Sequence, residues 1–318
     1  MRPDHTGKQH LSLNVGLLLV TVVPILMAGM KTLQLILCYD KTSGLLAQST
    51  TATAFSVLLW ICAAGVAAAG IWMGVTINGL SVPFRTGRPM LLGIGLFVVG
   101  ICFLGQSVAD LLAFLEIAEK LLQPGSTGTG EAGFLAYLHD TWGIGPIQIA
   151  VSVIGFITAI AFIVMAYSVV ATGRRPHLIV GLIPVIWCVV YMFNLMYTYE
   201  NLVSMQTNGV KTGVAILTVL FLYYMARNLW DLDGKREAPL GVFARILFPG
   251  FAFAEAMPYC VVYLMGIRDR VGNMPYLALT GLALYGGVGL IQLYLGACSS
   301  LRKAAGGEQY GFKWHKHR

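Results

Sequence analysis

The chain has 318 residues, of which 57% are hydrophobic and only 11% are charged. A soluble domain carries roughly 25% charged residues, so this composition excludes an ordinary water-soluble fold. The net charge of +7 lies in short loops and tails between apolar stretches, which favours a membrane topology signal over nucleic-acid binding.

Eight long apolar stretches follow one another along the chain. At 1.5 Å per residue, a helix of about 20 residues crosses a hydrocarbon core of about 30 Å. Because lipid cannot satisfy backbone groups, and because these runs are continuous rather than alternating, each is expected to be a helix. Gly70 and Gly74, one turn apart in the second run, predict close helix packing. The predicted fold is one all-α, polytopic membrane bundle with spans near residues 13–37, 52–77, 90–113, 147–171, 178–200, 212–230, 244–266 and 276–298.

Basic residues are distributed unevenly between alternate loops. If the N-terminus is cytoplasmic, 15 of the 21 lysines and arginines fall on the inner side, as the positive-inside rule requires. The alternation supports an even number of spans with both termini inside, and the short loops without N-x-[ST] sequons indicate a prokaryotic cell membrane. The outer side then holds only Lys31, Lys41, Lys120, Lys211, Arg268 and Arg270.

Two segments outside the spans are distinctive. The long outer loop, residues 117–146, ends in an aromatic stretch around Tyr137 and Trp142, which predicts a short helix at the membrane interface. A lid over an outward-facing cavity is the alternative interpretation. The basic tail, residues 299–318, is expected in the cytoplasm, where it either contacts anionic lipid or stays solvated.

Glu255 is the strongest candidate for a site residue. It lies near the middle of the span 244–266, between Pro249 and Pro258. A charge at that depth costs at least roughly 2.5–3.5 kcal/mol, and proline frees backbone carbonyls within a helix. These features predict a site for a small solute, a cation or a transported proton. The alternative is that Glu255 is protonated or hydrogen-bonded to a neighbouring Tyr, Asn or Gln.

Three further groups of polar residues are candidates for ligand or ion binding. Gln106 and Asp110 lie one turn apart near the outer end of their span, where a structural role is the stronger interpretation. Tyr191 and Asn194 belong to a polar stripe that either lines a cavity or joins neighbouring helices. Gln292 lies in a glycine-rich span, and both interpretations apply to it as well.

Motifs for catalysis, metals and cofactors are missing from the sequence. The string from Gly128 to Gly133 matches G-x-G-x-x-G but follows no predicted strand, so it is attributed to chance. G-x-x-x-x-G-K-[ST] and H-E-x-x-H do not occur, and all six histidines fall in loops or tails. The six cysteines lack C-x-x-C spacing, which predicts no metal site. We therefore expect no enzyme activity and no cofactor.

These features favour a small-solute or ion permease, or a permease subunit, without an ATPase of its own. The rival hypothesis is a membrane sensor or accessory protein that docks a partner at its cytoplasmic face. Besides the lipid bilayer, the expected partners are thus a small solute or cation and a cytoplasmic protein, and no nucleic acid. The predicted docking residues are Arg227, Lys235, Arg236 and Arg245.

Overall fold

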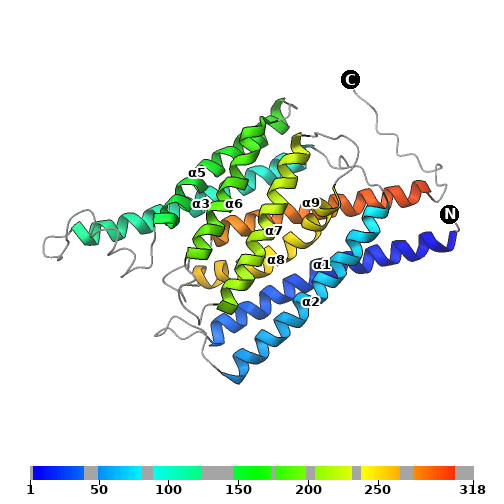
Figure 1. Ribbon diagram of the computed structural model, residues 1–318, viewed down its shortest axis with the longest axis horizontal. Helices are drawn as coiled ribbons and strands as arrows, with labels where there is room; N and C mark the ends of the chain where they lie inside the picture. Colours follow the sequence, from blue (N-terminus) through cyan, green and yellow to red (C-terminus); the bar gives the residue numbers. More distant parts are fainter. Residues whose placement is uncertain are drawn as a thin grey trace.

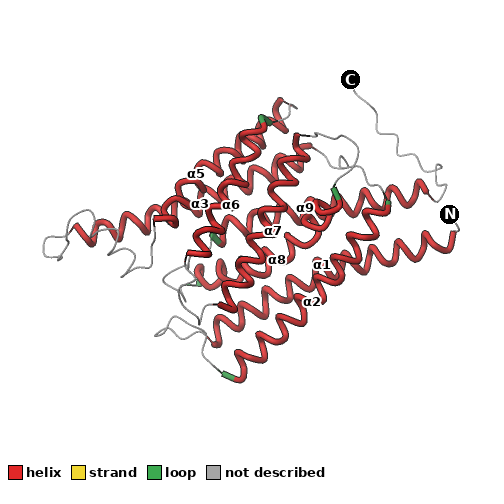
Figure 2. Tube along the Cα trace, viewed as in Figure 1, coloured by secondary structure: helices red, strands yellow, loops and turns green. Residues whose placement is uncertain are grey.

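The computed structural model describes residues 3–38, 49–80, 89–122, 146–172, 176–197, 205–230, 238–265 and 275–304. Every regular element in these ranges is helical, and no strand occurs in them (Figure 2). This confirms the all-α prediction for the described part of the chain. The elements are α1 (Pro3–Cys38), α2 (Thr50–Gly79), α3 (Pro89–Leu122), α5 (Pro146–Tyr167) with a π-helical turn η1 (Ser168–Thr172), α6 (Leu178–Tyr197), α7 (Met205–Trp230), α8 (Pro239–Leu264) and α9 (Tyr276–Ala304).

Eight of these helices are long and apolar enough to cross a membrane, in the predicted order. Several extend beyond the predicted spans, since a helix continues where its side chains turn polar and hydropathy detects only the apolar part. Helix α1 begins at Pro3, and α3 continues to Leu122, into the expected outer loop. Helix α9 continues to Ala304, so the expected tail begins as helix. The predicted interfacial helix around Trp142 lies outside the described residues.

Six helices close into a ring. Helix α3 packs against α5, α5 against α6, α6 against α7, α7 against α8, α8 against α9, and α9 returns to α3 (Figure 1). The interior of this ring is filled by one large cluster of buried apolar and aromatic side chains. Helices α1 and α2 form a hairpin that lies outside the ring and packs against α8. Helix α8 therefore makes most of the contacts between the ring and the hairpin, and α9 adds a smaller contact with α1.

Helix α8 is largely buried and packs closely against its neighbours. Fifteen of its 26 residues are buried, compared with 7 of 30 in α2. Glycines at its contacts let neighbouring helices approach closely, because a Cβ atom built on Gly70 or Gly74 of α2 would lie 2.3 or 2.4 Å from side-chain atoms of α8. At its contact with α1, α8 contributes a glycine of its own, because Gly250 lies against Pro24. The close packing expected for Gly70 and Gly74 is confirmed.

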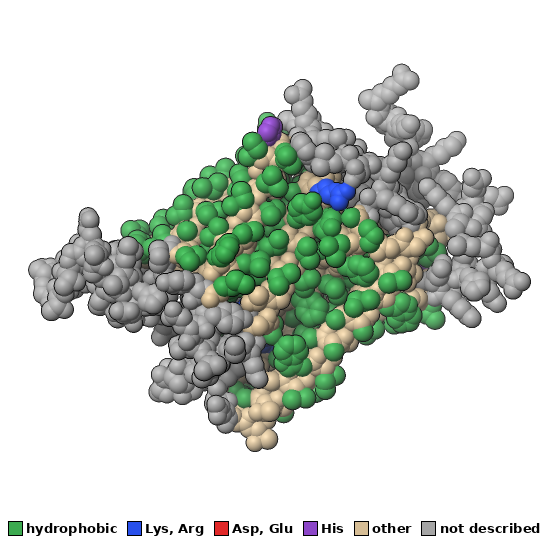
Figure 3. All heavy atoms as spheres, viewed as in Figure 1, with side chains coloured by type: hydrophobic (Ala, Val, Ile, Leu, Met, Phe, Trp, Pro, Cys, Tyr) green, Lys and Arg blue, Asp and Glu red, His purple; other side chains and the backbone are tan. Residues whose placement is uncertain are grey.

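The outward faces of the bundle are apolar. Trp60 and Ile61 of α2 are 62% and 63% exposed, and Leu264 at the end of α8 is 82% exposed. Figure 3 shows hydrophobic side chains over much of the visible flank, with basic and histidine side chains near one end. Soluble monomers rarely expose contiguous apolar patches larger than a few hundred Å². Eight apolar helices with such flanks indicate a multi-pass membrane protein.

Candidate functional site

An ion pair joins the hairpin to the ring inside the bundle. The ammonium of Lys31 on α1 donates to Oε2 of Glu255 on α8, and the two side chains are 17% and 5% exposed. Lys31 precedes the last residue of α1 by seven positions, and Glu255 precedes the last residue of α8 by nine. At 1.5 Å per residue, both lie about 10–14 Å from these helix ends, so the pair lies within the apolar spans.

Lys31 is the partner that sequence reasoning missed. From the sequence, Lys31 is expected among the few basic residues of the outer side, and Glu255 is expected to bind a cation or a neighbouring Tyr, Asn or Gln. The structure instead buries Lys31 against Glu255. One signal was available, because Lys31 falls inside the span 13–37, and an intramembrane charge requires a partner. Glu255 is the deepest acid in the predicted spans.

Tyr259 extends the site from Glu255 towards α7 and α9. The Nζ atom of Lys31 lies 5.1 Å from the centroid of the Tyr259 ring, and the Nζ atom of Lys211 on α7 lies 6.0 Å from it. Tyr276, the first residue of α9, stacks on the same ring with 4.3 Å between centroids and 14° between planes. A cation over an aromatic face gains about 0.5–1 kcal/mol, and more when desolvated. Four helices thus contribute charged or aromatic groups around Glu255.

Oε1 of Glu255 and the hydroxyl oxygen of Tyr191 on α6 are buried and have no hydrogen-bond partner among the described residues. Tyr191 is fully buried within the cluster that fills the ring. Leaving a buried polar group without a partner costs about 1–3 kcal/mol. The bundle therefore buries one carboxylate oxygen and one hydroxyl whose hydrogen bonds to water are not replaced by described residues.

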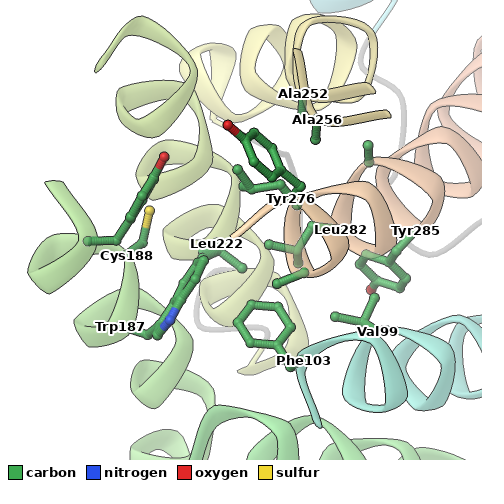
Figure 4. Packing of buried hydrophobic residues seen from close by; sticks show 14 of the residues in the cluster. Val99, Phe103, Trp187, Cys188, Leu222, Ala252, Ala256, Tyr276, Leu282 and Tyr285 are labelled. Carbon is green, nitrogen blue, oxygen red and sulfur yellow. The ribbon is translucent and has the colours of Figure 1, made fainter. Parts of the chain in front are cut away.

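Aromatic side chains pack around the ring of Tyr191. Trp187 stacks on Tyr191, with 5.7 Å between centroids and 10° between planes, and meets Phe103 of α3 edge to face at 4.6 Å. Figure 4 shows Phe103, Trp187, Leu222 and Tyr276 converging from α3, α6, α7 and α9. The interior at this level is packed with side chains. A solute can enter only if the helices or these rings move.

Gln106 and Asp110 form a junction between three helices. The Gln106 side-chain amide donates to Oδ1 of Asp110 at 2.9 Å, and the hydroxyl of Ser152 on α5 donates to Oδ2 at 3.2 Å. The Gln106 carbonyl oxygen accepts from the backbone N–H of Leu277 at 3.1 Å, in the first turn of α9, where amides have no partner within the helix. These bonds support the structural interpretation of both residues.

Replacing Gln106 with Leu should weaken this junction. The change removes a hydrogen bond to the Asp110 carboxylate and the partner of the Leu277 amide, so we expect a loss of about 1–3 kcal/mol of unfolding free energy. Titration with SDS in mixed micelles measures that loss. Ser152→Ala, which leaves both Gln106 bonds in place, should cost less. Equal stability of Gln106→Leu and the wild type would show that the junction contributes nothing.

Two other predicted binding residues lie on the ring helices. Asn194 is 3% exposed and lies on α6, three residues after Tyr191. Gln292 is half-buried on α9. Their use as ligands stays a prediction. Within the described residues, no group of three or more His, Cys, Asp and Glu side chains could hold a metal ion.

One of the four residues expected at the cytoplasmic docking surface is buried. Arg245 is only 8% exposed, because its guanidinium lies between α8 and α9 and donates to the carbonyl oxygen of Gly289 at 2.9 Å. It therefore holds two helices together and does not form part of an exposed surface. Arg227 lies in the last turn of α7 and is half-buried. Lys235 and Arg236 lie outside the described residues.

No protein-family model matches this chain, and no curated protein or solved structure shows significant similarity to it.

Proposed function

We propose that this chain carries a small solute or ion across a prokaryotic cell membrane, with both of its termini in the cytoplasm. The eight apolar helices and the basic residues in alternate loops support this topology. Helix α1 begins and α9 ends at the same end of the bundle, as an even number of crossings requires (Figure 1). With its apolar mass concentrated in spanning helices and no catalytic motif, the protein resembles a permease more than a membrane enzyme.

The main support is the Lys31–Glu255 pair, whose second carboxylate oxygen is buried without a hydrogen-bond partner among the described residues. Stability alone is a poor explanation for the pair, because replacing a buried ion pair with apolar residues is often neutral or stabilising. Ionisable residues within spans usually face a partner along a substrate or ion pathway. The pair also lies at the contact between the hairpin and the ring, so a ligand that competes for Glu255 would change how α1 packs on α8.

This coupling suggests how transport could proceed. With the pair closed, Lys31 holds α1 against α8. When a solute or a proton takes the place of Lys31 at Glu255, the hairpin is released and can move relative to the ring, as in rocking mechanisms of alternating access. Pro24, Pro249 and Pro258 lie inside α1 and α8. Because each removes a backbone hydrogen bond, they allow these two helices to bend near their contact.

Reconstitution in liposomes tests the proposal. Influx of erythritol, methylammonium or acetate, followed by light scattering after an osmotic shift, should exceed that of empty liposomes for at least one solute. Glu255→Gln and Lys31→Gln should reduce that influx at least tenfold, since each removes one member of the coupling pair. The matched control is Arg302→Gln, a charge-to-amide change at an exposed position near the end of α9, which should retain influx. Absence of any influx, or influx that survives both substitutions, would contradict the proposed function.

A further inference from the structure

The Lys31 ammonium occupies a cation site inside the bundle. Its Nζ atom donates to Oε2 of Glu255 and lies 5.1 Å from the centroid of the Tyr259 ring, so a carboxylate and an aromatic face fix the position of the charge. Proteins bind ammonium ions through these two kinds of group. The last two heavy atoms of a lysine side chain, Cε and Nζ, have the structure of methylammonium. The side chain of Lys31 therefore fills a space with the size and charge preference of a small primary ammonium ion.

Displacement of Lys31 requires a ligand that carries the same charge. When Lys31 leaves, the Glu255 carboxylate stays buried without its cation, which is costly where water is excluded. A neutral solute or an anion does not compensate this carboxylate, whereas an ammonium ion restores the charge balance. The ammonium of Lys211, 6.0 Å from the centroid of the Tyr259 ring, repels the incoming ion as it repels that of Lys31. Only a cation, or a proton on Glu255, can therefore exchange with Lys31.

The groups at this position favour an ammonium ion over a metal ion. Hard metal cations take about six or more oxygen ligands, whereas the described contacts of the Lys31 ammonium are one carboxylate and one ring. An ammonium needs only acceptors for its N–H groups and gains from the ring. Oε1 of Glu255 is also buried without a partner among the described residues. An ammonium that is not tethered to α1 can donate to both oxygens of the carboxylate.

The displaced Lys31 side chain has a route to water. It is 17% exposed, compared with 5% for Glu255, and it lies about 10 Å from the end of α1. Its flexible stem can carry the ammonium towards the lipid headgroups while a ligand takes its place. We infer that Glu255 and Tyr259 bind a small primary alkylammonium ion in exchange for Lys31, and that this ion is the transported substrate. The inference rests on the proposed transport function and names its substrate class.

Chemical rescue by methylammonium tests the site. Lys31→Gln leaves the Glu255 carboxylate without a cation, so methylammonium chloride should raise the Tm of this variant in detergent more than that of the wild type. The affinity obtained from this dependence should exceed that of the wild type at least about tenfold, because a tethered competitor is gone. Sodium chloride at the same concentration controls for salt. Should Lys31→Gln not fold alone, the yield of folded protein purified in each salt gives the same comparison.

Two kinds of double variant assign the rescue to Glu255 and to the ring. Lys31→Gln/Glu255→Gln lacks both charges, so its Tm should be the same in both salts. Lys31→Gln/Tyr259→Leu lacks the aromatic face and should bind methylammonium about two- to fivefold more weakly than Lys31→Gln. The matched control is Lys31→Gln/Tyr259→Phe, which keeps the ring and its stacking on Tyr276 and should retain the affinity of Lys31→Gln.

Influx into liposomes connects the site to transport. An inside-negative membrane potential should accelerate the uptake of radiolabelled methylammonium by the wild type, because the ion carries its charge across, whereas leakage of the neutral amine does not respond to the potential. Lys31→Gln should take up methylammonium more slowly than the wild type although it binds the ion more tightly, because it has lost the coupling pair.

The outcomes separate the site, the substrate and the function. Equal Tm of Lys31→Gln in both salts, or the same rescue in Lys31→Gln/Glu255→Gln, would overturn the site assignment. Influx of erythritol or acetate that depends on Lys31 and Glu255, without influx of methylammonium, would overturn the substrate class and leave the transport function standing. No influx of any probe would overturn the transport function and the substrate together.

Discussion

Lys31→Met should lower the free energy of unfolding by about 3–5 kcal/mol, because it leaves the Glu255 carboxylate buried without its cation. The double variant Lys31→Met/Glu255→Leu should recover most of that loss, since two apolar side chains of similar size replace the pair. It should nevertheless fail to transport any of the probe solutes. Stability is measured by SDS titration in mixed micelles, and transport by influx into liposomes.

A loss that persists in the double variant would show that Lys31 and Glu255 are not energetically coupled. Arg302→Met provides the control, because Arg302 is exposed near the end of α9. Neutralising an exposed cation that forms no buried ion pair changes the free energy of unfolding by less than about 0.5 kcal/mol. The comparison therefore isolates the effect of burial from that of removing a positive charge.

Gly250→Ala should separate α1 from α8. Its Cβ would lie 2.8 Å from Cγ of Pro24 and 3.3 Å from the backbone oxygen of Val20, and neither a proline ring nor a backbone atom can turn away. Overpacking of this kind costs about 1–3 kcal/mol. Glu255 lies five residues further along α8, so the same displacement should loosen the ion pair and lower solute influx. Unfolding in SDS and influx into liposomes measure the two effects.

The control for Gly250→Ala is Gly287→Ala on α9. Within the described part of the chain, nothing besides the adjacent backbone of α9 lies within 4 Å of the position that its Cβ would take. Alanine favours a helix interior over glycine by about 0.5–1 kcal/mol, so this variant should be as stable as the wild type or slightly more stable. If the two variants lost stability equally, the close contact between α1 and α8 would have no energetic weight.

The helices could be predicted from the sequence because hydropathy is a property of each segment alone. Their ends could not, because α1 and α3 continue past the apolar residues. Glu255 was identifiable for a related reason, since a single acid in an apolar run is conspicuous. The bond from Gln106 to Asp110 also follows from their spacing of four residues.

The rest of the site depends on tertiary packing. Lys31 and Glu255 meet only because α1 lies against α8, and no pattern within either helix indicates this contact. The hydropathy of α7 gives no sign that Lys211 approaches the Tyr259 ring, nor does the sequence indicate that Tyr276 stacks on it. The link from Gln106 to the start of α9 is likewise a property of the folded bundle.

The separation of 224 residues between Lys31 and Glu255 has a consequence for biosynthesis. At a translation rate of about 5–20 residues per second, the ribosome adds Lys31 to the chain about 10–45 s before it adds Glu255. During this interval the first helix must reside in the bilayer with its lysine uncompensated. A lysine about 10 Å from the helix end can extend its flexible stem towards the lipid headgroups and keep its ammonium hydrated. The nascent chain thus tolerates the charge of Lys31 until α8 inserts and Glu255 forms the ion pair with it.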